Sequence, residues 1–282
     1  MNYKLRTIKA FTLIELVVAV GILAIVLLFA SMIFKVSINS HRTAMANADI
    51  MQKLRAITNQ LNADFKGRRW IPGGKVLFNL TGNVRADCIA FFADGDFQST
   101  GQYGQTSAKE RTVAGNVAGI FWGQSAKPDP NSNNSAIIRE KILLRRQTIL
   151  TVDSNLPDPN LKPPGEYYNK SLSEWYADKI DANDLIERSA LDPARLADFE
   201  DLSVMYLAKG VDNFKIQFVE WDDNIKRFKW VPTNTDIKTN SDEWKKQFII
   251  ITKAFKFTFT LYDSKGILEK GRTFTHIVYV GD

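Results

Sequence analysis

Residues 11–34 read FTLIELVVAVGILAIVLLFASMIF, and no other stretch of the 282-residue sequence is as long and as apolar. The stretch holds one charged residue, Glu15, and no proline. As a helix rising ~1.5 Å per residue it would be about 36 Å long, whereas the hydrocarbon core of a bilayer is about 30 Å thick. The sequence therefore predicts one transmembrane helix over residues 11–34.

Three basic residues, Lys4, Arg6 and Lys9, precede this stretch, and the first ten residues hold no acid. Positive charge beside a span is retained on the cytoplasmic side of the membrane. We therefore expect a single-pass protein with a cytoplasmic N-terminus, whose bulk lies outside the cytoplasm. A cleaved secretory signal is a weaker interpretation, because the apolar run continues to residues 32–34 without a small-x-small cleavage site.

Glu15 is the unusual residue of this span. An ionised carboxylate costs about 2.5–3.5 kcal/mol at the centre of a membrane helix, and less near its end, so such a residue usually has a partner. Two interpretations are open: a functional pairing of Glu15, or an incidental charge at the edge of an ordinary anchor.

Residues 9–16, KAFTLIEL, resemble the prepilin processing motif of type IV pilins and type II secretion pseudopilins. In that family a prepilin peptidase removes a short basic leader and methylates the new N-terminus. The resemblance implies a leader over residues 1–10, cleavage between Ala10 and Phe11, and N-methylation of Phe11. The family usually has glycine where this chain has Ala10, so we expect less efficient cleavage.

The same resemblance gives Glu15 a partner, the ammonium of Phe11 on a neighbouring subunit of a fibre. An opposite-charge pair in a medium of low dielectric is favoured over two unpaired charges. The implied partners are the prepilin peptidase, other pilin or pseudopilin subunits and the bacterial inner membrane, with secreted cargo as a further possibility.

The helix should continue beyond the membrane over residues 35–67. No proline or glycine occurs between Lys35 and Lys66, and apolar residues recur there at three- and four-residue spacings. This pattern predicts an amphipathic helix that ends at Gly67 and packs on a domain through Met51, Leu54, Ile57, Leu61 and Phe65.

Residues 68–282 are predicted to form an antiparallel β-rich periplasmic head. Apolar runs at 75–80, 88–93, 120–122 and 141–152 are typical of strands, and Asp94-Gly95-Asp96 of a turn. Alternating patterns predict two hairpins, one from 214–221 and 226–231, the other from 248–262 and 273–280. The fold class is therefore α+β, with a long N-terminal helix packed on an antiparallel sheet as in pilins.

Long loop insertions are expected at about 98–135 and 153–208. Residues 98–110 and 125–135 are rich in Gly, Ser and Asn, and residues 156–165 hold four of the nine prolines, so all three are predicted to be exposed loops. Residues 171–208 show helical spacing and are predicted to form one or two short helices.

Two segments resemble one branch of the family more closely. They are residues 61–65, LNADF, late in the helix, and residues 209–216, KGVDNFKI, which lead into a strand followed by Trp221 and Trp230. Both resemble the J-type minor pseudopilin of type II secretion and the W-type minor pilin. The resemblance implies a minor rather than a major subunit.

No enzymatic constellation is evident in the sequence. The two histidines, His41 and His276, are far apart and lack a third ligand, and no phosphate-binding or dinucleotide motif occurs. Calcium could be held by residues 94–96 or 181–184, but neither has the pattern of an EF-hand loop. The lone Cys88 reads as a buried apolar residue. We expect no catalytic residue, no cofactor and no metal.

Composition narrows the class further. With 45% hydrophobic and 24% charged residues the chain is neither disordered nor collagen-like, and one cysteine excludes a disulfide scaffold. The net charge of +6 falls to +3 without the three leader charges, so no nucleic acid is expected.

The sequence predicts a non-enzymatic minor pseudopilin or minor pilin at or near a fibre tip. The alternatives are a tip adhesin or DNA-uptake minor pilin and, less favoured, an anchored periplasmic enzyme.

Overall fold

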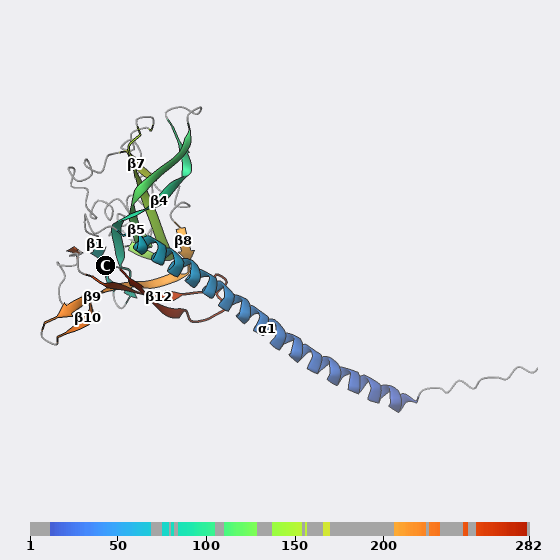
Figure 1. Cartoon of the computed structure of the whole chain (residues 1–282). Helices are drawn as coiled ribbons and strands as arrows, with labels where there is room; N and C mark the ends of the chain where they lie inside the picture. Colours follow the sequence, from blue (N-terminus) through green and yellow to red (C-terminus); the bar gives the residue numbers. More distant parts are fainter. Residues whose placement is uncertain are drawn as a thin grey trace, which may run out of the picture. The chain divides into compact units, whose positions relative to one another are not determined.

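The computed structural model describes residues 12–68, 75–78, 80–81, 84–104, 110–128, 137–153, 156, 166–169, 206–223, 226–231, 245–247 and 252–280. The chain divides into two compact units, residues 1–48 and residues 49–282. One helix, α1 (Leu13–Lys66), contributes to both. The described strands all belong to the second unit (Figure 1).

The fold is α+β, as predicted: a long N-terminal helix and β-sheets that are mostly antiparallel. A seven-stranded sheet has the order β11-β1-β4-β5-β6-β7, with β8 also paired to β6; a four-stranded sheet has the order β10-β9-β12-β13; β2 and β3 form a two-stranded ribbon. The β6 and β7 pair is parallel. The bounds are β1 (Lys75–Leu77), β2 (Leu80–Thr81), β3 (Val84–Arg85), β4 (Cys88–Tyr103), β5 (Arg111–Pro128), β6 (Ile137–Thr151), β7 (Tyr167–Asn169), β8 (Tyr206–Lys209), β9 (Val211–Asp222), β10 (Arg227–Val231), β11 (Lys245–Gln247), β12 (Ala254–Leu261) and β13 (Arg272–Tyr279).

The core of the second unit forms where the last turns of α1 meet both large sheets. Ile57, Leu61 and Phe65 are buried, as the apolar spacing predicts. The Phe65 ring lies 4.5 Å from that of Phe91 on β4 and 5.0 Å from that of Phe255 on β12, measured between centroids. Each such side chain contributes about 1.5–3 kcal/mol when fully buried. The helix therefore joins the two sheets through one apolar cluster.

The apolar stripe of the helix differs from the prediction at its start. Met51 is 41% exposed, whereas its neighbour Ile50 is fully buried. Ile50 lies seven residues before Ile57, which places both on the same side of the helix, and Met51 is turned about 100° away. The prediction for Met51 was therefore wrong, and Ile50 takes its place in the core.

Gly67 follows the last helical residue, as predicted for the end of the helix. Its carbonyl accepts a hydrogen bond from the amide of Asp94 on β4 at 2.6 Å. A Cβ atom at position 67 would lie 2.0 Å from the Asp94 carbonyl oxygen. The close approach of helix end and strand therefore requires glycine at this position.

Both predicted hairpins are present. β9 and β10 pair from Asp222 with Arg227 to Phe218 with Val231, and β12 and β13 pair from Leu261 with Arg272 to Ala254 with Tyr279. Alternation is a sign of a strand with one buried face, and here it identified the two hairpins. The pairing of β9 with β12, which joins them into one four-stranded sheet, was not predicted.

The predicted turn at residues 94–96 was wrong, and so were the predicted loops at 98–110 and 125–135 over residues 98–103 and 125–128. Residues 94–103 continue β4, with register shifts after Asp94 and after Gln98, and residues 125–128 end β5. Backbone pairing with a neighbouring strand does not need apolar side chains, so a polar, glycine-containing ribbon can extend beyond the core. Residues 105–109 and 129–136 lie outside the described residues.

Glu166 accounts for part of this extension of β4. Its carboxylate accepts hydrogen bonds from the amide of Gly101 at 2.7 Å and from the Tyr103 hydroxyl at 3.0 Å. Burial and this carboxylate raise the pKa of Tyr103 to about 12. A contact across 63 residues of sequence therefore supports strand structure in a segment whose composition predicted a loop.

The predicted helices over residues 171–208 are wrong at their end, because residues 206–208 belong to β8, which pairs with β6. Residues 170–205 lie outside the described residues, as do residues 157–165 of the proline-rich segment. The predicted antiparallel β-rich head also contains one parallel pair of strands, β6 and β7.

Candidate functional site

The helix α1 begins with a reciprocal pair of hydrogen bonds between Thr12 and Glu15. The Glu15 Oε2 atom accepts from the Thr12 amide at 2.9 Å and from its hydroxyl at 2.8 Å, and the Glu15 amide donates to Thr12 Oγ1 at 3.4 Å. Thr12 precedes the first helical residue, so it is the N-cap, and Glu15 is the third residue of the helix. This is a capping box, which satisfies backbone donors that the helix itself leaves without partners.

The capping box uses only part of the Glu15 carboxylate. Both bonds accepted from Thr12 go to Oε2, and no described residue donates to Oε1. Glu15 is exposed within its unit. One carboxylate oxygen therefore closes the start of the helix while the other can accept a donor from another chain.

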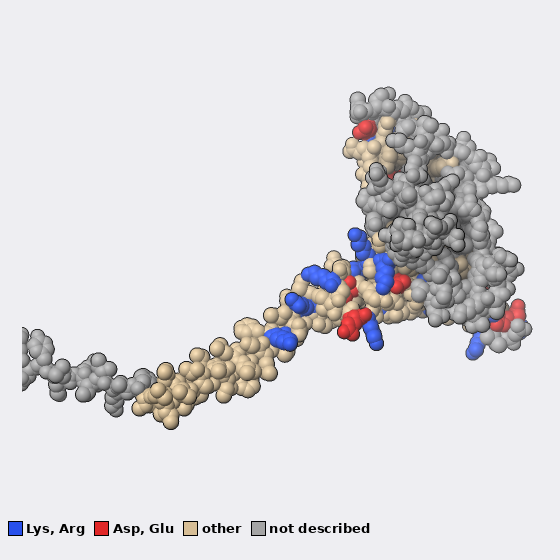
Figure 2. Space-filling model, turned by 180° about the vertical axis from the view of Figure 1, so that it is seen from behind, with Lys and Arg blue, Asp and Glu red and all other residues tan. Residues whose placement is uncertain are grey.

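The segment after Glu15 is apolar and outward-facing on all sides of the helix. Large apolar residues from Leu16 to Phe34 are between about half and two thirds exposed. In Figure 2 this part of α1 is a continuous tan surface, and Lys and Arg side chains first appear beyond it. Among the described residues this is the one helix long and apolar enough to cross a membrane. Ala10 and Phe11 lie outside the described residues.

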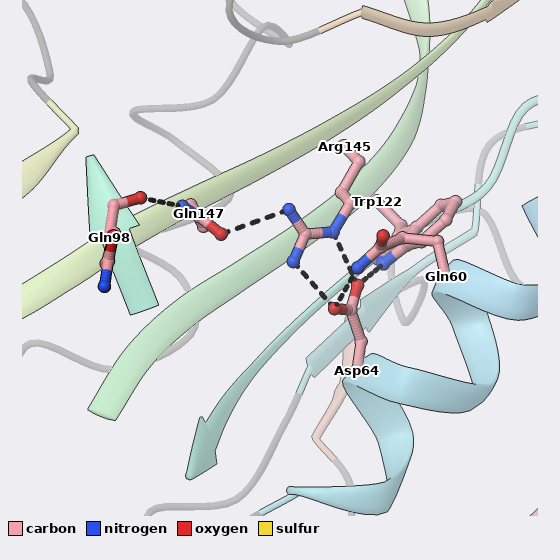
Figure 3. Close-up of polar contacts among 6 residues, drawn as sticks. All are labelled: Gln60, Asp64, Gln98, Trp122, Arg145 and Gln147. Carbon is pink, nitrogen blue, oxygen red and sulfur yellow. Dashed lines mark hydrogen bonds and ion pairs between the residues drawn. The ribbon is translucent and has the colours of Figure 1, made fainter. Parts of the chain in front are cut away.

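A second polar constellation lies in the second unit, around the carboxylate of Asp64 (Figure 3). Arg145 on β6 binds it in a bidentate manner, with Nε 2.8 Å from Oδ2 and Nη2 2.7 Å from Oδ1. Trp122 on β5 donates its indole N–H to Oδ2 at 2.8 Å, and Gln60, one turn earlier on the helix, donates to Oδ1 at 2.9 Å. We call Gln60, Asp64, Trp122 and Arg145 the Asp64 cluster.

The Asp64 cluster is buried, with 3% of the Asp64 side chain and 15% of the Arg145 side chain exposed. Arg145 also donates to Gln147 Oε1 at 3.3 Å, and Gln147 donates to the Gln98 carbonyl at 2.9 Å. Four donors thus converge on one carboxylate, and the chain of bonds continues across the sheet to β4. The arrangement fixes helix to sheet; no described residue in it is placed for covalent chemistry.

A second buried ion pair, between Arg85 and Asp87, joins the segment before β4 to β9. Asp87 Oδ2 accepts from the Ile216 amide at 2.7 Å, and Arg85 donates to the Ile216 carbonyl at 3.0 Å. Arg85 and Asp87 side chains are 1% and 0% exposed. The sequence analysis did not predict this pair, because two charged residues separated by one position are typical of an exposed loop.

The other candidate residues do not form a reactive site. His276 lies on β13 with Nε2 2.9 Å from Asn62 Oδ1, and burial lowers the pKa of His276. Cys88 is buried in its strand, as predicted. Among the described residues, no group of three or more His, Cys, Asp or Glu side chains is placed to hold a metal ion, which includes Asp94 and Asp96. Residues 181–184 lie outside the described residues.

The fold and the N-terminal site define the class: an α+β protein with a capped, apolar N-terminal helix that fits a single-pass membrane anchor. Residues 5–31 match the family model of the prokaryotic N-terminal methylation motif. No curated protein and no solved structure matches the chain. The match supports the pilin and pseudopilin family, whose members are typically structural, and its motif implies processing by a prepilin peptidase and assembly with other pilin subunits.

Thr12→Ala removes the hydroxyl that both donates to Glu15 and accepts from its amide. We expect the first turn of α1 to fray, with a loss of about 0.5–2 kcal/mol of local helix stability, as is usual when an N-cap is removed. Amide hydrogen exchange of residues 13–16 in detergent micelles measures the loss. Thr12→Ser keeps the hydroxyl and is the matched control; equal exchange rates in the two variants would contradict the capping role.

Arg145→Ala leaves the Asp64 carboxylate buried without its ion-pair partner. We expect a loss of about 3–5 kcal/mol in the free energy of unfolding, which urea titration followed by circular dichroism measures. The control is Arg111→Ala, which removes a more exposed ion pair with Asp153 and should cost about 0–1 kcal/mol. Combining Asp64→Leu with Arg145→Leu leaves no buried charge alone, so it should cost less than the sum of the single variants. Equal costs for Arg145→Ala and Arg111→Ala would refute the assignment.

Proposed function

We propose that this chain is a minor subunit of a type II secretion pseudopilus or a type IV pilus, assembled at or near the fibre tip. The observation that carries the proposal is the methylation motif over residues 5–31. The motif includes the capped start of α1 and much of its apolar segment. In this proposal the prepilin peptidase cuts between Ala10 and Phe11 and methylates Phe11. The helix stays in the inner membrane until assembly, with the β-rich head in the periplasm.

The assembly step rests on the free oxygen of the Glu15 carboxylate. Cleavage would create an ammonium at Phe11, the residue directly before the N-cap. In a fibre, Glu15 Oε1 would accept that ammonium from a neighbouring subunit while Oε2 remains bonded to Thr12. A charge pair of this kind fixes the axial register of two helices, because each charge is costly in a low-dielectric medium unless it is paired.

The finer assignment to the J-type or W-type branch rests on the pattern around Asp64. The resemblance places an aspartate late in the helix, and in this chain that aspartate holds the helix to β5 and β6. A head of this size is suited to capping a fibre or contacting secreted cargo, because its strands extend well beyond the core that α1 needs.

The processing step is tested by the intact mass and N-terminal residue of the membrane-extracted protein, expressed with and without a prepilin peptidase. We expect N-methylated Phe11 only when the peptidase is present. Ala10→Gly restores the usual family residue and should increase the processed fraction, whereas Ala10→Leu should block cleavage by its bulk. A chain that still begins at residue 1 or 2 under both conditions would show that it is an ordinary anchored protein.

Glu15→Gln separates the two roles of this side chain. A glutamine at the third helical position still accepts hydrogen bonds from Thr12, so the capping box is kept, but the charge is lost. We expect normal membrane insertion and cleavage, with strongly reduced recovery in sheared fibres, measured by immunoblotting. Thr12→Ala, which keeps the charge, is the comparison. If Glu15→Gln enters fibres as well as the native chain, the charge pair does not drive assembly.

A further inference from the structure

The four-stranded sheet has one buried face and one exposed aromatic face. Phe214, Phe257 and Phe259 point into the core and are fully buried. On the opposite side Trp221, Phe228 and Tyr279 are 47%, 57% and 78% exposed. Aromatic side chains clustered at such exposure mark an interaction surface more often than a solvated one.

The strand register places a groove on this face of the sheet. Val219 pairs with Trp230 and Ala254 with Tyr279, and the pairing of Phe218 with Phe255 sets Val219 beside Ala254. A single row across four strands therefore places two smaller residues between two aromatic ones. An open groove of about 350 Å³ lies here, which Phe228 also lines.

Three lysines lie at or beside the groove. Lys229 and Lys253 line it, and Lys229 forms an ion pair with Asp222 at 2.9 Å, whereas the described partner of Lys256 is an aromatic ring. Lys256 lies two residues from Ala254 on the same face, with Nζ 4.7 Å from the centroid of the Trp230 ring. Lys253 lines the groove, and Lys215, which pairs with Thr258, is the diagonal neighbour of Lys256. Among the described residues no ion pair involves Lys215, Lys253 or Lys256.

The pKa values of both lysines on the sheet face, Lys215 and Lys256, are lowered. Burial lowers the pKa of Lys256. The pKa of Lys215 is lowered by burial, then by Arg85 and by Lys256, whereas Asp87 raises it. Like charges that disfavour one another gain from a bound anion, so the face favours an acidic ligand.

The geometry favours a peptide over a single-stranded nucleic acid. Nucleic acids need open ring faces on which bases can stack. Here the Trp221 and Phe228 rings pack edge to face on each other at 5.0 Å, and Lys256 lies over Trp230. Asp223, bonded to the Trp221 indole at 3.1 Å, would also repel phosphates at that end.

We propose that the outer face of the β10-β9-β12-β13 sheet binds an acidic peptide segment of a partner protein, with an apolar side chain in the groove over Val219 and Ala254 and a carboxylate beside Lys256. This surface lies apart from the N-terminal motif in sequence, and the proposal stands whether or not Phe11 is methylated. The groove supplies apolar contact, and the lysines select the charge of the ligand.

The test uses the full chain in nanodiscs made of neutral lipid and two fluorescently labelled synthetic peptides. The peptides share the same leucine and phenylalanine positions, but one has aspartate and glutamate where the other has lysine. We expect the acidic peptide to bind about tenfold more tightly by fluorescence anisotropy, which corresponds to about 1.4 kcal/mol. Lys256→Glu should abolish this preference, and Phe228→Ala should weaken both peptides.

Lys270→Glu is the matched control, because it makes the same change in net charge on the exposed β12–β13 connection. It should leave the preference intact, which shows that local rather than total charge selects the peptide. Circular dichroism confirms that each variant is folded. Equal binding of the two peptides, or equal effects of Lys256→Glu and Lys270→Glu, would overturn the proposal. A polythymidine strand that outcompetes the acidic peptide would replace it with nucleic-acid binding.

Discussion

The second unit is organised around one buried carboxylate, that of Asp64. A charge with 3% of its side chain exposed is tolerated only when its lone pairs are satisfied, and here Arg145, Trp122 and Gln60 together donate four hydrogen bonds to it. Apolar contacts such as those of Phe65 are not directional, so they could be kept in several rotations of the helix. The bidentate geometry of Arg145 permits only one, and it therefore sets the register in which helix and sheet pack.

Polar contacts of the same kind connect the sheets to one another. Arg85 and Asp87 bind both backbone groups of Ile216, and they hold the start of β4 against β9. Glu166, directly before β7, makes a similar contact within the seven-stranded sheet, where it bonds to the far end of β4. The apolar cluster thus supplies most of the stabilisation, while three carboxylates, each bonded to a strand or helix distant in sequence, specify which surfaces meet.

The periodicity of apolar residues predicted the helix and strands that have one face in the core. It failed for strand segments whose backbone pairing continues beyond the core. The apolar stripe of α1 and the alternation in β9, β12 and β13 identified these elements because one face of each is buried. Residues 98–103 gave no such signal, because their strand structure depends on pairing with β5 and on Glu166. At the N-terminus the motif was evident from local sequence, since Thr12 and Glu15 act across three residues. The two partners of Asp64 on the sheet, Trp122 and Arg145, are 58 and 81 residues away and could not be predicted from spacing.

The capping box clarifies how a carboxylate can reside at the start of a membrane helix before any partner is present. An isolated Glu15 would have to be desolvated together with the free amides of the first turn, and each is costly in lipid. Bonding Oε2 to Thr12 offsets part of both costs within one chain. The other oxygen, Oε1, has no donor among the described residues. A cation from outside the chain would therefore stabilise the carboxylate most by approaching this oxygen. In the proposed assembly step Thr12 would act together with Glu15, because it holds the carboxylate at the helix end, where the ammonium of a neighbouring subunit would arrive.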